Sequence, residues 1–381
     1  MTDRFKTAHQ FFVGDSGSMP EIDDHSIDLV VTSPPYPMIQ MWDDQFSLSD
    51  PKIGKALEMN HGAKAFELMH RRLDPVWAEV YRILKPGGIA AINIGDATRT
   101  VDGQFQLFPN HARIITTCLS DGFTQLPTII WRKPTNSPTK FMGSGMLPPS
   151  AYVTLEHEYI LIFRKGEKRE FDDDKEIRRQ SAYFWEERNA WFSDIWFDLL
   201  GARQESGHQR ENKRTGAFPL DLPFRLIHMF SIRGDTVVDP FLGTGTTMIA
   251  AMCAGRNSIG YEIDGGLQSG ILEKLSDVPA MANRMTRARL EAHHHFIEER
   301  MRTKGNMKYV NRPHGFRVMT KQEEDLCLLM VRNVQYRSIS KFTIEYGGLG
   351  QPGFDETRSM PVGDPSTSEN RPPKGRQMKL F

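Results

Sequence analysis

Residues 236–247 read TVVDPFLGTGTT, and an apolar stretch of helical character follows them to residue 253. This order predicts a strand, then a glycine turn, then a helix. Gly243 and Gly245 let the backbone approach a ligand closely, and the first turn of the helix presents free N–H groups to an anion. Such a unit is typical of α/β folds, in which ligands bind beyond the carboxyl ends of parallel strands.

An acidic residue stands at the end of the next expected strand, 258–261. Glu262 follows Gly243 by about 20 residues. At that separation in dinucleotide sites a carboxylate accepts hydrogen bonds from the ribose hydroxyls. The turn and the acidic residue together predict a nucleoside site.

Three interpretations of the glycine turn compete. A Walker loop would need Gly-Lys-Ser/Thr before the helix, whereas Thr246 and Thr247 follow Gly245, which disfavours ATP. A nicotinamide fingerprint would need a third glycine where Met248 stands, so that match is partial. A purely structural turn is the third interpretation, and the preceding Asp-Pro-Phe together with Glu262 disfavours it.

The rest of the chain alternates short β-branched runs with helix-like stretches. Strands are expected at 11–13, 27–31, 89–94, 128–131, 159–163, 236–238 and 258–261, and helices at 65–84 and 223–232. The predicted fold class is α/β: a mainly parallel twisted sheet with helices on both faces, plus a smaller C-terminal region.

A second stretch combines a strand with a stiff turn. Residues 27–36 read IDLVVTSPPY, so an apolar strand stops at two successive prolines. Prolines neither donate to a sheet ladder nor continue smoothly into a helix. The turn carries the hydroxyl of Ser33 and the ring of Tyr36, and it is expected to face the same crevice as the glycine turn. A strand-ending turn packed by Tyr36 is the purely structural alternative.

The composition excludes several classes of protein. The chain has 381 residues, of which 39% are hydrophobic and 25% charged, as in an ordinary globular protein with one large α/β domain and a smaller one. It shows neither the apolar core of a signal peptide nor a run approaching the roughly 18 residues that span a bilayer. We therefore expect a cytoplasmic protein with no membrane partner.

No metal site is expected. The three cysteines lie far apart and give neither a disulfide framework nor zinc-ligand spacing. His293, His294 and His295 are adjacent in an expected helix, and adjacent helix positions do not share a face. We therefore interpret these histidines as exposed.

The two stretches together resemble the motifs of the S-adenosylmethionine-dependent DNA amino-methyltransferases. The catalytic motif of that family, (Ser/Asn/Asp)-Pro-Pro-(Tyr/Phe/Trp), corresponds to Ser33-Pro34-Pro35-Tyr36. Its cofactor motif, Asp-Pro-Phe-x-Gly-x-Gly-Thr-Thr, corresponds to residues 239–247. The catalytic motif precedes the cofactor motif by about 200 residues, an order that resembles the circularly permuted β class.

Other matching stretches extend the resemblance roughly from residue 11 to residue 264. They are Leu-Lys-Pro-Gly-Gly at 84–88, His-Glu-Tyr at 157–159 and Phe-Pro-Leu at 218–220. The resemblance implies a Rossmann-like, circularly permuted catalytic domain in residues 1–264.

The resemblance implies methyl transfer to the exocyclic amine of a base flipped out of double-stranded DNA. Tyr36 would stack on the base, and the Ser33 hydroxyl and Pro34 carbonyl would accept hydrogen bonds from the amine. Pro34 and Pro35 make the turn rigid, which favours a pre-set attack geometry. The amine itself attacks, so no protein nucleophile is required.

The implied cofactor is S-adenosylmethionine, and its implied contacts are Asp15, Asp239, Phe241, Gly243, Gly245, Thr246, Thr247 and Glu262. Phe241 would lie against the adenine or the methionine part. Thr246 or Thr247 would hold the methionine carboxylate, and Glu262 the ribose. Asp15 would lie near the adenine amine, with a helix N-cap as the alternative interpretation.

The target base follows less directly. Within this family, serine at the first catalytic position is commoner among enzymes that act on N4 of cytosine, and Asp or Asn among those that act on N6 of adenine. A hydroxyl can accept one hydrogen bond and donate another to a ring nitrogen, and both bases offer that nitrogen. We favour cytosine N4, with adenine N6 as the alternative.

Three regions are candidates for reading the DNA: a loop at 136–150, a charged and then aromatic segment at 166–196, and a basic segment at 284–317. The resemblance implies an inserted target-recognition segment at 166–210, and because that stretch is short, the C-terminal basic region 265–350 is expected to share the task. Net charge is zero, but residues 271–320 hold ten Lys/Arg against five Asp/Glu, which indicates a local basic surface or a solvated helix face. The expected DNA contacts are Arg132, Lys133, Lys140, Arg178, Arg179, Lys213 and Arg214. The tail, 351–381, is expected to be disordered.

Two rival functions remain. An RNA or protein-glutamine methyltransferase would typically carry Asn-Pro-Pro-Tyr, so Ser33 and the permuted order count against it. A DNA-binding protein without activity is the other rival, and the intact motifs favour an active enzyme over it.

A restriction endonuclease that acts on the same site is a possible partner. The sequence indicates no oligomeric state.

Overall fold

The computed structural model describes residues 5–133, 142–199, 218–305 and 307–349. These residues belong to one unit of contacts, Met1–Leu349, and the expected tail lies outside the described residues. Residues 265–349, expected as a smaller region, contribute two strands to the main sheet.

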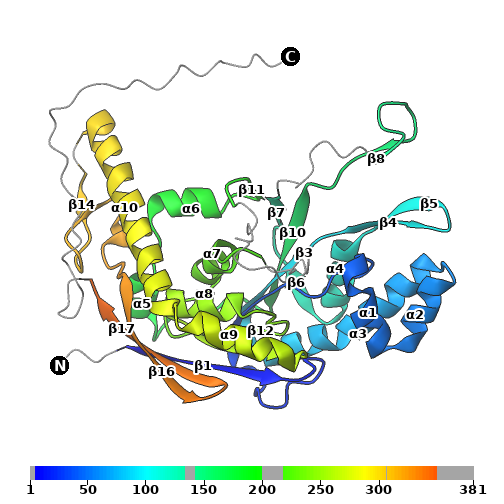
Figure 1. The fold of residues 1–381 in the computed structure, drawn as a ribbon. Coiled ribbons are helices and arrows are strands. Elements are labelled where there is room, and N and C mark those ends of the chain that lie inside the picture. The colour runs from blue at the N-terminus through cyan, green and yellow to red at the C-terminus, as the bar shows by residue number, and fades with distance from the viewer. Residues whose placement is uncertain (1–4, 134–141, 200–217, 306, 350–381) are drawn as a thin grey trace. The chain divides into compact units, whose positions relative to one another are not determined.

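The main sheet has the strand order β11-β7-β10-β3-β2-β12-β13-β1-β17-β16, with β6 paired to β10 (Figure 1). Its strands are β1 (Lys6–Val13), β2 (Ile27–Thr32), β3 (Leu84–Ile94), β6 (Phe123–Gln125), β7 (Ile129–Arg132), β10 (His157–Lys165), β11 (Ile195–Trp196), β12 (Thr236–Asp239), β13 (Asn257–Glu262), β16 (Leu329–Ser338) and β17 (Lys341–Gly348). The central strands β3-β2-β12-β13-β1 are all parallel, whereas β10 and β17 join them antiparallel. All seven expected strands lie in this sheet, so the predicted α/β class is confirmed.

Helices cover both faces of the sheet (Figure 1). One face packs against α1 (Asp43–Ser49), α2 (Pro51–Glu58), α3 (Gly62–Ile83) and α4 (Asn110–Ser120), and the other against α7 (Asp221–Phe230), α8 (Thr246–Ala254), α9 (Gln268–Leu275) and α10 (Val278–Lys304). The remaining elements are α5 (Lys175–Gln180), α6 (Trp185–Trp191), the 3-10 helices η1 (Gln40–Trp42), η2 (Gly265–Leu267) and η3 (Lys321–Glu323), and the hairpins β4–β5 (Ala97–Val101, Gln104–Phe108), β8–β9 (Met142–Gly143, Ala151–Tyr152) and β14–β15 (Tyr309–Val310, Arg317–Val318). In the described ranges, no helix combines the length and apolar character needed to cross a bilayer.

The strand pattern explains the two layers of helices. Successive strand residues point to opposite faces. Leu29 and Val31 of β2 join the core beneath α7 and α8, and Val30 between them joins the core beneath α3. Every residue of β2 is buried, as expected for a parallel strand covered on both faces.

Two local expectations differ from the structure. The strand expected at 89–94 begins at Leu84, so β3 includes the Leu-Lys-Pro-Gly-Gly stretch, and its pairing with β2 shifts register between Ile27 and Leu29. The interpretation of His293 as exposed is wrong: its side chain is buried, contacts Glu186 and the Arg317 carbonyl, and stacks on Phe184.

The reason is that α10 packs against α6 and β15 at this point, which its own sequence period does not reveal. His294 and His295 are exposed, as expected. Among the described residues, no group of three or more His, Cys, Asp or Glu side chains could hold a metal ion.

Candidate active site

The turn after β2 places a hydrogen-bonded cluster at the carboxyl end of the sheet. The Ser33 hydroxyl donates to Tyr36 Oη at 3.1 Å, and Tyr36 Oη donates to Glu158 Oε2 at 3.0 Å. Asn93, at the end of β3, donates from Nδ2 both to Tyr36 Oη (2.8 Å) and to Glu158 Oε2 (2.7 Å). The other carboxylate oxygen of Glu158 pairs with Lys133.

The turn itself is anchored from α4. The buried Asn110 donates to the carbonyls of Pro37 (3.0 Å) and Gly95 (2.9 Å). A Cβ on Gly95 would stand 3.0 Å from the Tyr36 ring, so a larger residue there would crowd the ring. The half-buried Tyr36 ring is therefore held in position before any base arrives.

The surroundings of Tyr36 also fix its protonation. Burial of the hydroxyl, and then the Glu158 carboxylate, raise the pKa of Tyr36 well above its usual value. Tyr36 therefore keeps its proton, and stays a hydrogen-bond donor, throughout the pH range in which DNA enzymes work.

The second turn begins at the end of β12. The buried Asp239 accepts hydrogen bonds at Oδ1 from the Thr32 hydroxyl (2.6 Å) and from the Phe241 N–H (3.0 Å). Burial raises the pKa of Asp239 to about 6, against the opposing effect of the hydrogen bonds from Thr32 and Phe241. Because Thr32 directly precedes Ser33, this contact holds the predicted catalytic and cofactor turns together.

The glycines of the turn have the backbone that the prediction requires. Gly243 and Gly245 have φ values of +53° and +83°, a region that favours glycine. A Cβ on Gly243 would meet only the Phe241 carbonyl, at 3.9 Å, so this side of the turn is open to a ligand. Thr246, half-buried, begins α8, whereas the buried Thr247 hydroxyl donates to the Val31 carbonyl at 3.3 Å.

The acidic residues lie at neighbouring strand ends. Glu262 ends β13, and its carboxylate accepts from the N–H groups of Gly243 (2.7 Å) and Asp264 (2.9 Å). Asp15 follows β1 and is exposed, and its carboxylate accepts a hydrogen bond from the Gly17 N–H at 2.8 Å. The residues directly after it, 16–22, form turns and no helix. The helix N-cap interpretation of Asp15 is therefore wrong, because its carboxylate caps a turn.

These features fit a ligand with a nucleoside and an amino-acid part. The open glycine turn leads into a helix N-terminus, which suits a carboxylate. Glu262 lies one strand away and suits ribose hydroxyls, and Phe241 offers a half-buried aromatic ring, packed at 6.0 Å against Trp77. The residues predicted to bind S-adenosylmethionine thus lie at three adjacent strand ends.

The predicted DNA contacts separate into three groups. Arg132 ends β7 and Lys133 follows it, at the same edge as the active site, since Arg132 pairs in register with His157 and Lys133 contacts Glu158. Lys140, Lys213 and Arg214 lie outside the described residues.

Arg178 and Arg179 lie elsewhere. They belong to α5, and Arg169, just before it, contacts Asp174 as well as Asp28 and Asp235 at the amino ends of β2 and β12. The structure therefore does not bring α5 to the carboxyl ends of β2 and β12, where the two predicted site turns lie.

Sequence reasoning missed the roles of Asn93, Glu158 and Asn110. Glu158 was visible in the His-Glu-Tyr stretch, and Asn93 stands at the end of an expected strand. Only the pairing of β10 with β3, which sets Tyr159 opposite Ile94, brings these two side chains together at Tyr36.

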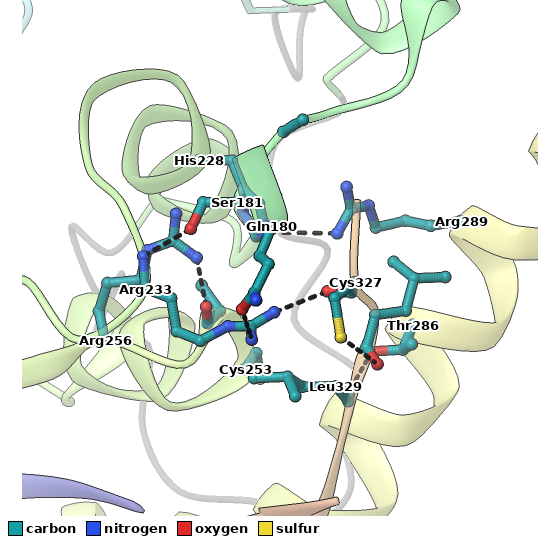
Figure 2. A pocket seen from close by; sticks show the side chains of 13 residues that line it. Gln180, Ser181, His228, Arg233, Cys253, Arg256, Thr286, Arg289, Cys327 and Leu329 are labelled. Atoms are coloured by element: carbon teal, nitrogen blue, oxygen red, sulfur yellow. Dashed lines mark hydrogen bonds between the residues drawn. The ribbon is translucent and has the colours of Figure 1, made fainter. Parts of the chain in front are cut away.

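A separate small cavity of about 30 Å³ lies where α5, α7, α8 and α10 meet (Figure 2). Three arginines line it, and each has a protein partner. Arg233 donates to the Cys327 carbonyl, Arg256 to the Ser231 carbonyl, and Arg289 contacts the buried His228. The cavity is remote from Ser33, and its polar groups are satisfied within the fold.

Comparison with known proteins agrees with the geometry. A family model described as DNA methylase, of the N6/N4 methyltransferases, matches residues 27–272. The type II methyltransferase M.MthZI of Methanothermobacter thermautotrophicus is 50% identical over 344 residues, which are 90% of this chain and 95% of that protein. M.MjaI of Methanocaldococcus jannaschii, also a type II methyltransferase, is 54% identical over 280 residues, 71% of this chain and 91% of that protein.

A solved structure extends the likeness to three dimensions. TTHA0409 of Thermus thermophilus, described as a putative DNA modification methylase and crystallised with S-adenosyl-L-methionine, is 33% identical with a TM-score of 0.55. The match covers 71% of this chain and 95% of that one. With a family model across more than half of its length and two long relatives of at least 50% identity, this chain belongs to the N6/N4 DNA methyltransferase family.

Proposed function

We propose that this enzyme transfers the methyl group of S-adenosylmethionine to the N4 amine of cytosine in double-stranded DNA. The N6 amine of adenine is the alternative target. The observation that carries the proposal is the 2.6 Å hydrogen bond from Thr32 to Asp239, which holds the Ser33 turn beside the open glycine turn. Serine at the first catalytic position favours cytosine over adenine.

The chain's own residues prepare the amine of a flipped base for attack. Tyr36 presents a pre-positioned ring for stacking, worth about 1–3 kcal/mol per base in comparable platforms. The Ser33 hydroxyl and the Pro34 carbonyl accept hydrogen bonds from the two amine hydrogens. Amine geometry then moves towards tetrahedral, which frees the nitrogen lone pair from the ring.

The cofactor, when bound, would supply an activated methyl group on its sulfonium: as the N–C bond forms, the methyl C–S bond breaks, sulfur leaves as a neutral thioether and the amine releases one proton. Glu262 would accept hydrogen bonds from its ribose, Phe241 would pack against its adenine or methionine part, and Gly243 would let the backbone approach it. Thr246 stands at the start of α8 for the methionine carboxylate, and Asp15 lies at the next strand end for the adenine amine.

We further propose that the enzyme works in a restriction–modification pair. Two long relatives are named type II methyltransferases, which supports this context. The partner would be a restriction endonuclease that cuts the same sequence when it is unmethylated. Both would act in the compartment that holds the DNA, for which the sequence predicts the cytoplasm.

The test is to incubate the purified enzyme with unmethylated DNA and labelled S-adenosylmethionine, digest the DNA to nucleosides and identify the product by mass spectrometry. N4-methylcytosine is expected, and N6-methyladenine would overturn only the choice of base. Tyr36→Ala should lower the rate by roughly 5- to 150-fold, from the lost stacking. Absence of methyl transfer to any DNA by the wild type would shift the assignment to RNA, to protein, or to binding alone.

A further inference from the structure

The Ser33 hydroxyl has one hydrogen, and its direction decides what the side chain can do for a base. A serine hydroxyl donates one hydrogen bond and accepts up to two. If its hydrogen faces the base, it can donate to a ring nitrogen. If its hydrogen faces the protein, only lone pairs face the base. The contacts around Tyr36 settle this direction.

Glu158 is the fixed end of the chain of hydrogen bonds. Its Oε1 pairs with Lys133, and its Oε2 lies 3.0 Å from Tyr36 Oη and 2.7 Å from Asn93 Nδ2. A carboxylate only accepts hydrogen bonds. Both neighbours of Oε2 must therefore donate to it, which orients the Asn93 amide with its nitrogen towards Glu158.

Tyr36 passes this direction on to Ser33. The single hydrogen of Tyr36 Oη is directed to Glu158, and Asn93 donates its second hydrogen to Tyr36 Oη at 2.8 Å. The remaining lone pair of Tyr36 Oη faces Ser33 Oγ at 3.1 Å, so Ser33 must be the donor. Ser33 therefore keeps only lone pairs for the crevice.

We propose that Glu158 is a positioning residue that acts through Tyr36 to make Ser33 a hydrogen-bond acceptor for the exocyclic amine of the flipped base. This inference rests on the proposed function, and it holds for cytosine or adenine. The sequence left open whether the Ser33 hydroxyl also donates to a ring nitrogen of the base. In this arrangement it does not, because its hydrogen is directed to Tyr36. Asn93 and Lys133 support the same arrangement by holding both oxygens of Glu158.

The test compares two variants with matched controls. Tyr36→Phe keeps the stacking ring and removes only the hydroxyl, and Glu158→Gln replaces the acceptor by a group that can also donate. Tyr81→Phe, in α3, and Glu58→Gln, at the exposed end of α2, make the same chemical changes away from the crevice. Melting temperature and S-adenosylmethionine affinity confirm that each variant folds and binds.

The rate of a single turnover is measured at saturating DNA, first on the natural target. Tyr36→Phe and Glu158→Gln should each slow methyl transfer at least tenfold, with cofactor affinity within twofold of wild type. Both controls should remain within twofold of wild type. A Glu158→Gln enzyme that folds, binds the cofactor and turns over like wild type overturns the proposal.

A base analogue separates positioning from a structural role. The target base is replaced by its deaza form, which keeps the amine and replaces the neighbouring ring nitrogen by carbon: 3-deazacytosine, or 1-deazaadenine if adenine is the target. In Tyr36→Phe the freed Ser33 hydroxyl can donate to the ring nitrogen. The ratio of analogue rate to natural rate should therefore change at least threefold between wild type and Tyr36→Phe.

An unchanged ratio, even with a slower variant, would mean that Tyr36 and Glu158 only support the turn, and the proposal fails. The failure of the proposed function looks different, because the wild type would then methylate no DNA at all.

Discussion

The Thr32 hydroxyl donates a 2.6 Å hydrogen bond to the buried carboxyl of Asp239, and this contact extends the pairing of β2 with β12. In register the two strands share only the pairs Leu29–Val237 and Val30–Val238. Beyond those pairs, the ends of the two strands are joined by a side-chain hydrogen bond and not by backbone pairing. The relative position of the catalytic and cofactor turns therefore depends on a few polar groups.

Removal of the Thr32 hydroxyl should destabilise the fold measurably. Thr32→Val keeps the shape of the side chain but leaves Asp239 with one donor fewer, a loss of about 1–2 kcal/mol in the free energy of unfolding. Thr116→Val is the matched control, because the exposed Thr116 hydroxyl only bonds the Ala112 carbonyl in its own helix. Urea denaturation of both variants checks this, and equal losses would contradict it.

The Asp239 carboxyl should make stability fall as pH rises. Its pKa is raised to about 6 in the folded protein, so between its unfolded value and pH 6 the folded state binds more protons than the unfolded chain. The free energy of unfolding then decreases with pH across that window, by on the order of 3 kcal/mol for this group.

Asp239→Asn removes the titration and can keep both bonds to Oδ1. Relative to this variant, the wild type should lose stability as pH rises from the unfolded pKa of the carboxyl to its folded pKa of about 6. At higher pH the difference in the free energy of unfolding between the two proteins should stay constant. Urea denaturation at several pH values measures the difference. A constant offset across the whole range would contradict the prediction, because it would show that Asp239 binds protons equally in the folded and unfolded states.

A methyl group on the open side of the glycine turn should block the cofactor. Gly243→Ala should raise the dissociation constant for S-adenosylmethionine by at least tenfold, because the added Cβ enters space that no protein atom occupies within 3.9 Å. Gly103→Ala is the control, since Gly103 also has positive φ (+71°) with open space around it, but lies in the β4–β5 turn.

Both substitutions should cost about 1–2 kcal/mol of backbone strain. Isothermal titration and thermal melting separate this shared loss of stability from the loss of affinity. If Gly103→Ala weakened cofactor binding as much as Gly243→Ala, strain rather than occupancy of the turn would be responsible.

The DNA should contact the edge of the sheet that carries Arg132. Arg132→Ala should weaken DNA binding and reduce the dependence of log K on log salt concentration by about 1, the value for one phosphate contact. The exposed ion pair of Arg132 with Glu156 (3.1 Å) is a weak competitor. Binding is measured by fluorescence anisotropy at several salt concentrations.

Arg178→Ala provides the comparison at the opposite edge. Because α5 lies near the amino ends of β2 and β12, its effect on the salt dependence should be much smaller. Equal effects of the two substitutions would mean that the DNA also reaches the amino edge of the sheet.

Local patterns in the sequence predicted the central strands well. The runs that became β2 and β12 are rich in Val or Ile and end in turn residues, so their burial could be predicted from the sequence. β16 and β17 were missed, because polar residues interrupt the apolar alternation and β17 is held by its pairing with β1, more than 300 residues away.

The candidate site divides in the same way. Ser33, Tyr36 and Gly243 belong to contiguous motifs whose chemistry is visible in a few letters. The contact of Tyr36 with Glu158 joins residues 122 positions apart, and no local period reports it. A cluster of basic residues in the sequence also does not show on which side of the fold it lies. Arg132 and Arg178 were therefore equivalent candidates, and only the structure places them at opposite ends of the strands.

The permuted order of the strands has a consequence for synthesis on the ribosome. β2 lies between β3 and β12, and β12 leaves the ribosome about 200 residues after β2. At 5–20 residues per second, one edge of β2 waits roughly 10–40 seconds for its partner. A nascent chain of this enzyme therefore exposes the unpaired backbone edge of β2, a mostly apolar strand. A product truncated before β12 would keep that edge exposed and would be a substrate for chaperones rather than a DNA-binding enzyme.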